Sequence, residues 1–487
     1  MIDRERKFVG IQVAPINFID EGVESLLDAL GGRFGINAVM IGTVSWLGLK
    51  VGRRVSRELE GWPDHGKRTD RPLRGGSYLA PHPEYYSRTV IKSFRADDEE
   101  VAGIDILELC IPQAHARGIR VYADLMEPMF GYAGHGASRS VDVPNLPQLL
   151  QVDVLGRITS EPCINNPDYR NWLCGLIEDH CRSYELDGIM WCNERRSPLD
   201  ASIIGRAPHC FCPHCSELAA RQGIDVDRAR VAMRAVWELL QSAREGGALL
   251  DGAFVEFLRV IYQNPEALLW ERFWVDRNKE LDRELFGIVK FCNPAIEFGL
   301  NVWNRNHFNP WRKAQWPWGE QAQWADWVKP IVYQHQSGGI FFDEWAPLLA
   351  TMFRDLDPTA VTELAKAALH LHEAPWDSIV KAGLDPDTYV FGQCRETLEA
   401  VRGRLAVYMG IGVDAPRTRA DQAVCTPDIV RRSVLATYRA GGNGVIFGPA
   451  YSGMNLTTLD GAADALKDLG LFATSRSSTP TSERAVQ

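Results

Sequence analysis

The sequence predicts a (β/α)8 barrel, or TIM barrel, with long insertions in the loops that follow its strands. Eight short apolar segments recur along the 487 residues, and stretches with helical spacing lie between them. A doubly wound sheet would alternate in the same way, but the segment after the first strand, residues 14–17, is not a glycine-rich phosphate loop. The length also allows two or three smaller domains. We expect one barrel over residues 1–474.

Each predicted strand is an apolar run of about four to nine residues, bounded by turn-forming residues. In chain order the predicted strands are Phe8–Ala14, Ile36–Gly42, Ile119–Leu125, Asp187–Cys192, Ala295–Trp303, Trp327–Gln334, Leu405–Ile411 and Gly444–Gly448. No internal repeat is evident, so the prediction of a barrel depends on the alternation of strands and helices along the chain.

Helical patterns fill most of the connections. The predicted helices are Glu21–Leu30, Asp98–Arg117, Pro167–Tyr184, the span from Asp225 to Val289 with breaks near Gly246 and Asn264, Pro358–His372 and Pro427–Tyr438. Long loops run from Val44 to about Asp97 and from Pro128 to Pro162, and the aromatic residues of the first favour an ordered lid. Residues 475–487 are expected to form a disordered tail.

Composition limits the choice of partner and compartment. The formal charge of −10 argues against nucleic acid or an anionic membrane as the main partner. No apolar run of about 20 residues is present, and the N-terminus lacks the pattern of a signal peptide. Eleven cysteines in such a chain indicate reduced thiols, some of them metal-bound. We therefore expect a cytoplasmic protein that acts on a small molecule, and we expect it to form a homo-oligomer.

Polar residues follow the predicted strands, at the end of the barrel where active sites lie. These residues are Asn17, Trp46, Glu127, Asn193, Glu194, Asn301, Trp303, Asn304, His335, Asp414, Tyr451 and Asn455, with Glu344 in the loop after the sixth strand as a further acid if it points inward. Aromatic rings stack on sugars, amides bind hydroxyl groups, and paired carboxylates cleave glycosidic bonds. The pattern therefore predicts a site for a small neutral carbohydrate.

Glu194 is the first candidate for proton transfer, because it directly follows an apolar strand and partial burial there suits a general acid. A salt bridge to Arg195 or Arg196 is the structural alternative. Asn193 beside it is suited to bind a sugar hydroxyl.

Other site residues have two interpretations each. His335 is either a substrate ligand or a histidine satisfied within its loop. Trp46 and Trp303 either stack on the sugar or cap the barrel core, and Tyr451 is expected among the substrate-binding residues. Glu127 fits better as an arginine partner that fixes a loop than as a catalytic group.

The cysteines after the fourth strand predict a metal site. Cys210, Cys212 and Cys215 form a C-x-C-x-x-C motif, and tetrahedral sites built from thiolates select zinc. Cys163 is the preferred fourth ligand, with His209 or His214 as alternatives. Four protein ligands leave no open position, so the expected Zn²⁺ would be structural.

Residues 163–215 resemble glycoside hydrolase family 42, the β-galactosidase type. The resemblance covers Cys163, Pro167, Tyr169 and Arg170, then Asn193-Glu194, then the three clustered cysteines. It implies that Glu194 is the acid/base and that Cys163, Cys210, Cys212 and Cys215 bind zinc. The family's nucleophile is a Glu at the end of the seventh strand. Here that strand reads LAVYMGIGVDAP, which contains no Glu.

The sequence therefore predicts a glycoside hydrolase with Glu194 as acid and Asp414 or Glu344 as nucleophile or base. One alternative is a metal-dependent sugar isomerase or lyase that uses Glu127, Glu194, His335 and a further oxygen. Another is a barrel that binds sugar without turning it over, which the missing glutamate makes reasonable.

Overall fold

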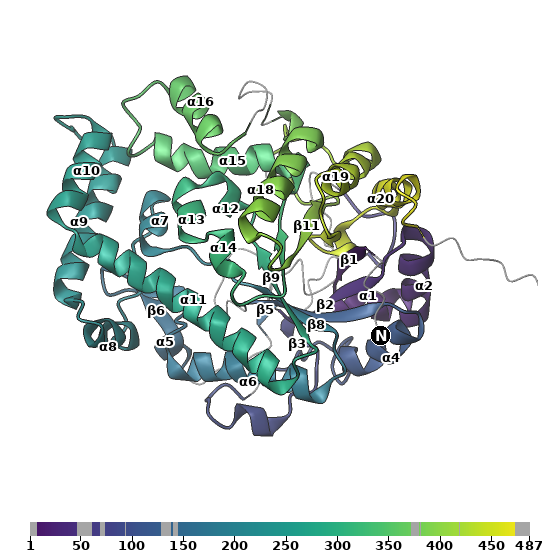
Figure 1. Ribbon diagram of the computed structural model, residues 1–487. Coiled ribbons are helices and arrows are strands. Elements are labelled where there is room, and N and C mark those ends of the chain that lie inside the picture. Colours follow the sequence, from purple (N-terminus) through teal and green to yellow (C-terminus); the bar gives the residue numbers. More distant parts are fainter. Residues whose placement is uncertain are drawn as a thin grey trace, which may run out of the picture.

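A computed structural model describes residues 7–45, 61–68, 74–92, 94–127, 138–139, 145–371, 379, 381–417 and 419–472. Its centre is a closed ring of parallel strands (Figure 1). These strands are β1 (Phe8–Val13), β2 (Ala38–Ser45), β4 (Arg120–Met126), β8 (Gly188–Cys192), β9 (Glu297–Val302), β10 (Trp327–Pro330), β11 (Ala406–Gly412) and β12 (Gly444–Gly448). Strand β1 pairs with both β2 and β12 and so closes the ring. The predicted barrel and its eight strands are confirmed.

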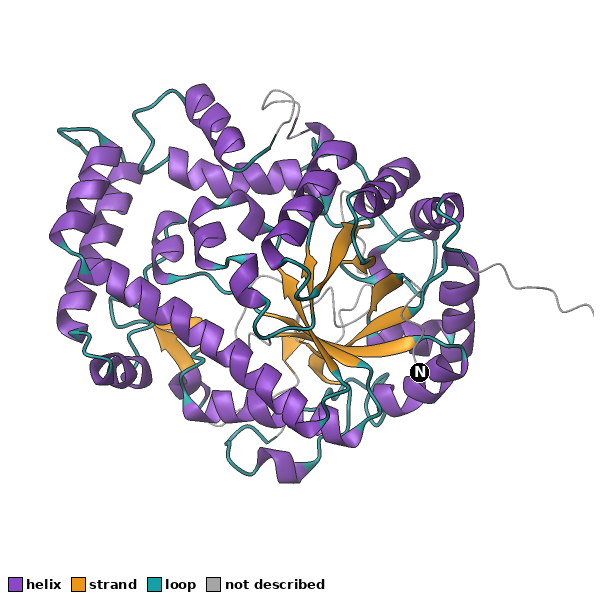
Figure 2. Ribbon diagram, in the orientation of Figure 1, coloured by secondary structure: helices purple, strands orange, loops and turns teal. Residues whose placement is uncertain are grey.

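Helices surround the barrel on its outer side (Figure 2). The helices that precede the next barrel strand are α2 (Val23–Phe34), α4 (Ile106–Ala116), α6 (Pro167–Ser183), α11 (Glu266–Cys292), α14 (Trp318–Gln321), α18 (Phe391–Val401) and α19 (Pro427–Arg439), and α20 (Leu456–Asp468) follows β12. As predicted, the Asn166 side chain caps α6, accepting hydrogen bonds from the Asp168 and Tyr169 amides.

The loops after the strands carry further elements. These are α1 (Pro15–Glu21), β3 (Arg74–Ser77), η1 (Pro83–Tyr86), β5 (Ser138–Arg139), α5 (Leu146–Leu149), β6 (Leu150–Val152), β7 (Ile158–Pro162), α7 (Pro198–Ile203), α8 (Pro213–Arg221), α9 (Val226–Arg244), α10 (Ala253–Gln263), α12 (Arg305–Phe308), α13 (Pro310–Gln315), α15 (Gln334–Leu349), α16 (Pro358–Ala368), η2 (Pro386–Val390) and η3 (Tyr451–Gly453). Helices α7 to α10 form the largest insertion, between β8 and α11.

Several predicted boundaries differ from the structure by a few residues, and two of them have a clear local cause. Helix α4 begins at Ile106 because the Asp105 side chain accepts hydrogen bonds from the Leu107 and Glu108 amides, which marks the first turn. The sixth barrel strand ends at Pro330, and the segment from Gln334 is the first turn of α15. Within the described part of the chain, no helix is both long and apolar enough to cross a bilayer.

The amino-terminal end of the barrel is closed by aromatic rings. Phe8 stacks on Tyr408 with ring centroids 4.1 Å apart, and Tyr122 and Trp327 pack against them. Glycine on a neighbouring strand makes room for these rings, since a Cβ atom on Gly299 would lie 2.0 Å from the Trp327 ring. The packed floor leaves only the carboxyl end of the barrel for a site.

Candidate functional site

Glu194 lies at the carboxyl end of β8, where the chain leaves the barrel, and is half-buried. The thiol of Cys192 donates a hydrogen bond to its Oε1 at 3.2 Å. Burial raises the pKa of Tyr333 well above its usual value, and the nearby Glu194, Asp124 and Cys192 act in the same direction. Glu194, Asp124 and Cys192 therefore lie within electrostatic range of the Tyr333 phenol.

Below them, a chain of hydrogen bonds crosses the barrel. Lys329 Nζ on β10 donates to Gln12 Oε1 on β1 at 2.5 Å, and Gln12 Nε2 donates to Asp124 Oδ2 on β4 at 2.8 Å. All three residues are buried, with exposures of 0% for Lys329 and 2% for the other two. Buried charged groups are retained only where they are paired and hydrogen-bonded, and they concentrate at functional sites.

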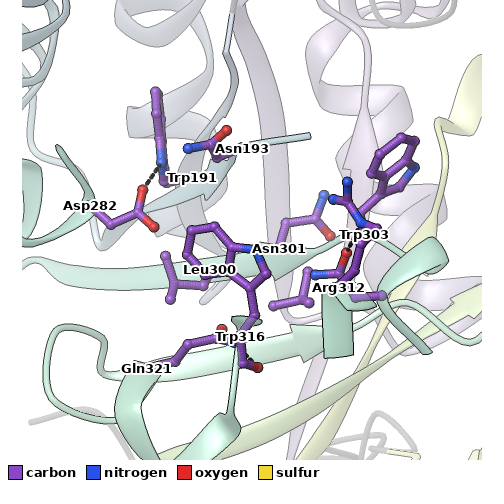
Figure 3. A pocket seen from close by; sticks show the side chains of 11 residues that line it. Trp191, Asn193, Asp282, Leu300, Asn301, Trp303, Arg312, Trp316 and Gln321 are labelled. Carbon is purple, nitrogen blue, oxygen red and sulfur yellow. Dashed lines mark hydrogen bonds between the residues drawn. The ribbon is translucent and has the colours of Figure 1, made fainter. Parts of the chain in front are cut away.

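A narrow pocket adjoins the mouth between β8, β9 and the helices α11, α13 and α14 (Figure 3). Three predicted substrate ligands, Asn193, Asn301 and Trp303, line it together. Asn301 Nδ2 donates to Cys192 Sγ at 3.1 Å, while its buried Oδ1 has no hydrogen-bond partner among the described residues. The structure thus brings these three residues to one place, and their role in binding a carbohydrate stays a prediction.

Asp282 of α11 lines the same pocket and accepts a hydrogen bond from Trp191 Nε1 at 2.9 Å (Figure 3). Burial raises the pKa of Asp282 to about 7, although hydrogen bonds from Trp191 and Asn193 act in the opposite direction. A carboxyl group that titrates near neutral pH in a pocket is typical of functional sites.

This shift predicts a pH dependence of stability. Between about pH 4 and pH 7 the unfolded chain loses the Asp282 proton while the folded protein keeps it, so the free energy of unfolding falls as the pH rises through that window. In Asp282→Asn the free energy of unfolding should decrease less between about pH 4 and pH 7 than in the wild type. Urea unfolding at several pH values measures this difference. Asp428→Asn, at an exposed position, is the control. Parallel curves for the Asp282 variant and the wild type would contradict the prediction.

Glu127 and the residue after Glu194 form a buried ion pair. Arg195 Nε donates to Glu127 Oε2 at 2.5 Å and its second amino group donates to Glu127 Oε1, which also accepts from the Tyr169 hydroxyl at 2.7 Å. Arg195 also donates to the Pro162 carbonyl at 2.6 Å. These contacts match the prediction that Glu127 fixes a loop through an arginine, and they hold the backbone beside Glu194 in place.

Glu344 lies in helix α15 and not in a loop, and it is buried. Its carboxylate accepts from Arg196 at 2.8 Å and from Arg305 at 2.5 Å. Burial alone would raise the pKa of Glu344, but the two guanidinium groups outweigh it and lower the pKa to about 2. The guanidinium groups of Arg196, Arg305 and Arg312 also surround the Trp303 ring, at 5.3, 5.4 and 4.6 Å from its centroid.

Asp414 connects the loop after β11 to the start of α20. Its Oδ2 accepts from the backbone amide of Asn455 at 2.7 Å and from the Asn455 side chain at 3.1 Å, and Thr458 donates to its Oδ1 at 3.4 Å. Its φ of 46° is unusual for a residue other than glycine but is tolerated by aspartate. These contacts give Asp414 a structural role.

His335 and Tyr451 do not line the pocket that contains Asn193, Asn301 and Trp303. His335 Nε2 is 3.2 Å from the Ala415 carbonyl, and burial lowers the pKa of His335 to about 4, so the ring is neutral. It lines a separate pocket with Gln334. The Tyr451 hydroxyl donates to Glu21 Oε2 at 3.1 Å. Trp46 lies outside the described residues.

Four cysteines form the candidate metal centre. The sulfur atoms of Cys163, Cys210, Cys212 and Cys215 all lie within 4.8 Å of one another, and all four residues are buried. Cys163 Sγ is 3.4 Å from Cys215 Sγ and 3.5 Å from Cys212 Sγ. Sulfur atoms around a tetrahedral zinc would lie about 3.8 Å apart at a zinc–sulfur distance of about 2.3 Å, so the cluster can hold a metal ion.

The surroundings of this cluster also suit thiolate ligands. Asn165 Nδ2 donates to Cys215 Sγ at 3.2 Å, and the Val152 amide donates to Cys210 Sγ at 3.4 Å. Among the described residues, the four cysteines are the one group of three or more potential ligands close enough to share an ion, and Glu127, Glu194 and His335 do not form another. The cluster ties the β6–β7 hairpin and the start of α6 to the loop after β8.

Sequence reasoning missed four buried residues of the mouth: Gln12, Asp124, Lys329 and Tyr333. The available signal was a polar residue inside an apolar run, as in FVGIQV, RVYADLM and WVKP. Polar side chains in the middle of a parallel barrel strand point either into the barrel or against the helices, and either position requires a partner.

Comparisons with known proteins agree with the fold. The sequence matches no family model and no curated protein. Among solved structures, the chain is similar to the β-galactosidase of Marinomonas ef1, with a TM-score of 0.53 and 11% identity over 95% of this chain and 59% of that chain. The β-galactosidase of Halorubrum lacusprofundi has a TM-score of 0.52 and 14% identity over 95% of this chain and 58% of that chain. The β-galactosidase of Rahnella sp. R3 has a TM-score of 0.52 and 13% identity over 96% of this chain and 56% of that chain. The chain thus spans less than two thirds of each. This likeness shows the fold alone.

Proposed function

We propose that this protein is a glycoside hydrolase that acts on a small neutral glycoside. The observation that carries the proposal is the position of Glu194, which is half-buried at the carboxyl end of β8 and accepts a hydrogen bond from the Cys192 thiol. A carboxyl group that is partly shielded from water at the mouth of a barrel is suited to protonate the leaving oxygen of a glycoside. The β-galactosidase names of the similar barrels support the same class.

Glu194 would protonate the oxygen of the leaving group. Arg195 and Arg196, the two neighbours that the sequence offered as salt-bridge partners, form other ion pairs: Arg195 pairs with Glu127, and Arg196 pairs with Asp200 and Glu344. The amides of Asn193 and Asn301 would bind sugar hydroxyls in the adjacent pocket. The alternative of a metal-dependent isomerase has less support, because the residues it requires do not form a group in the described part of the chain.

The four-cysteine cluster would hold one structural Zn²⁺. Four thiolates complete a tetrahedral shell and leave no open position for substrate, so the ion would brace the loop and take no part in the reaction. Pro162, whose carbonyl accepts from Arg195, directly precedes Cys163. The metal centre would therefore stabilise the arginine beside Glu194. Together with the Asn193-Glu194 pair, the cluster supports a relationship to glycoside hydrolase family 42.

The test is hydrolysis of a panel of nitrophenyl glycosides and natural disaccharides by the purified wild-type protein. We expect release of nitrophenol or free sugar from at least one neutral glycoside. Calorimetric binding of a sugar without turnover of any compound in the panel would favour the binding-only alternative. Turnover that is lost in a chelator and restored by Mn²⁺ while zinc remains bound would favour the isomerase or lyase alternative.

A further inference from the structure

We propose that Asn165, whose side chain is oriented by Arg277, keeps Cys215 in its thiolate form and so strengthens metal binding at the four-cysteine cluster. The inference rests on the proposed metal centre and deepens it. Asn165 lies two residues after Cys163, between that candidate ligand and the start of α6. It is 8% exposed, so its amide group must find its partners within the protein.

The orientation of the Asn165 amide follows from its partner on α11. Arg277 Nε donates a hydrogen bond to Asn165 Oδ1 at 2.9 Å, and the same guanidinium group also donates to Glu280, which holds it in place. A guanidinium group has donors and no acceptor, so the atom that faces Arg277 must be the amide oxygen. The amide nitrogen is then directed to the other side, where Nδ2 donates to Cys215 Sγ at 3.2 Å. One orientation of the amide therefore satisfies both contacts.

The contact with the sulfur favours its charged form. A thiol sulfur is a weak acceptor, whereas hydrogen bonds to a charged acceptor are stronger, and a donor fixed beside an ionisable group stabilises its negative form. Cys215 is 1% exposed, so bulk water does not supply such a donor. Metal ions bind the thiolate and not the thiol, so the amide favours the metal-bound state of the cluster.

The charge of the loaded cluster increases the need for such donors. Four thiolates around one Zn²⁺ leave an excess of negative charge in the protein interior. A buried charge is costly unless hydrogen bonds compensate it. Asn165 donates to Cys215, and the Val152 amide donates to Cys210 Sγ at 3.4 Å, so two of the four sulfur atoms receive an N–H donor from the described residues. The first donor is a side chain and can be removed by substitution.

The test replaces Asn165 with leucine, which has a similar size and no polar atom. We expect Asn165→Leu to bind zinc about 10–100-fold more weakly than the wild type, measured by competition with a chromophoric chelator under reducing conditions. Arg277→Met should weaken zinc binding by a smaller factor, because the amide can then turn away from the sulfur. Arg272→Met, at an exposed position of the same helix, is the matched control and should bind zinc as the wild type does.

Cobalt in place of zinc gives a readout that a purely structural role would not change. Loss of the N–H donor raises the electron density on the Cys215 sulfur, so the sulfur-to-cobalt charge-transfer band of Asn165→Leu should move to longer wavelength. The d–d bands should keep the pattern of a tetrahedral site, which shows that the variant is folded around the metal. Unchanged zinc affinity, or weaker affinity with an unchanged charge-transfer band, would overturn the proposal.

The result does not depend on the hydrolysis assay. If the wild type shows these metal-binding differences from Asn165→Leu but cleaves no glycoside, the proposed hydrolase function is wrong and the role of Asn165 stands. If the wild type binds neither zinc nor cobalt, the metal centre and the role of Asn165 are both wrong, whatever glycosides the protein cleaves.

Discussion

Replacing Glu194 with glutamine is expected to lower kcat by about 10²–10⁴-fold for glycosides whose leaving group needs protonation. The change preserves the shape of the side chain and removes the proton that the leaving oxygen takes. The effect on kcat/KM should be much smaller for dinitrophenyl glycosides, because that leaving group departs without protonation. Measurement of kcat/KM over a series of aryl glycosides with different leaving-group pKa values would show the steeper dependence in the variant.

Glu185→Gln, in the exposed segment before β8, is the matched control and should behave as the wild type. Equal turnover by the Glu194 variant and the wild type across the series would exclude Glu194 from proton transfer.

The second large effect concerns the cysteine cluster. Cys215→Ser is expected to lower bound zinc from one per chain to less than about 0.1 and to reduce the free energy of unfolding by several kcal/mol, since a thiolate site that forms only in the folded chain couples metal binding to folding. Elemental analysis gives the zinc content, and thermal unfolding gives the stability. Prolonged treatment of the wild type with a strong chelator should have the same effect.

Cys292→Ser is the control, because Cys292 is half-buried at the end of α11 and outside the cluster. It should retain the zinc. A wild-type protein that contains no metal after purification without chelators, with the same melting temperature as Cys215→Ser, would contradict the structural zinc site.

The fold was largely predictable because barrel strands are buried on both faces. Runs such as GIMWC and GVIFG are apolar throughout, which separates them from the amphipathic helices between them. Helix boundaries were predictable where a capping residue and a proline coincide, as at Asn166-Pro167. Where the start depends on a side chain within a polar stretch, as at Asp105, the predicted boundary was eight residues too early.

The candidate site was predictable only in part. Asn193, Asn301 and Trp303 follow strand ends, and they line one pocket as their positions suggested. The partners of charged groups were not predictable, because Glu344 meets Arg196 and Arg305 only in the folded chain. The sequence distance from Gln12 to Lys329 is 317 residues, and no local pattern indicates such a contact. The cysteine cluster was easier to predict than these contacts. Three of its four candidate ligands lie within one short motif, and thiolates are typical zinc ligands.

A crystal structure of the Glu194→Gln variant with an unhydrolysed glycoside tests the central claim most directly. The account predicts a sugar ring in the barrel mouth, with the glycosidic oxygen within hydrogen-bond distance of the side chain at position 194. A sugar bound away from the mouth, or with its glycosidic oxygen beyond the reach of that side chain, would contradict it.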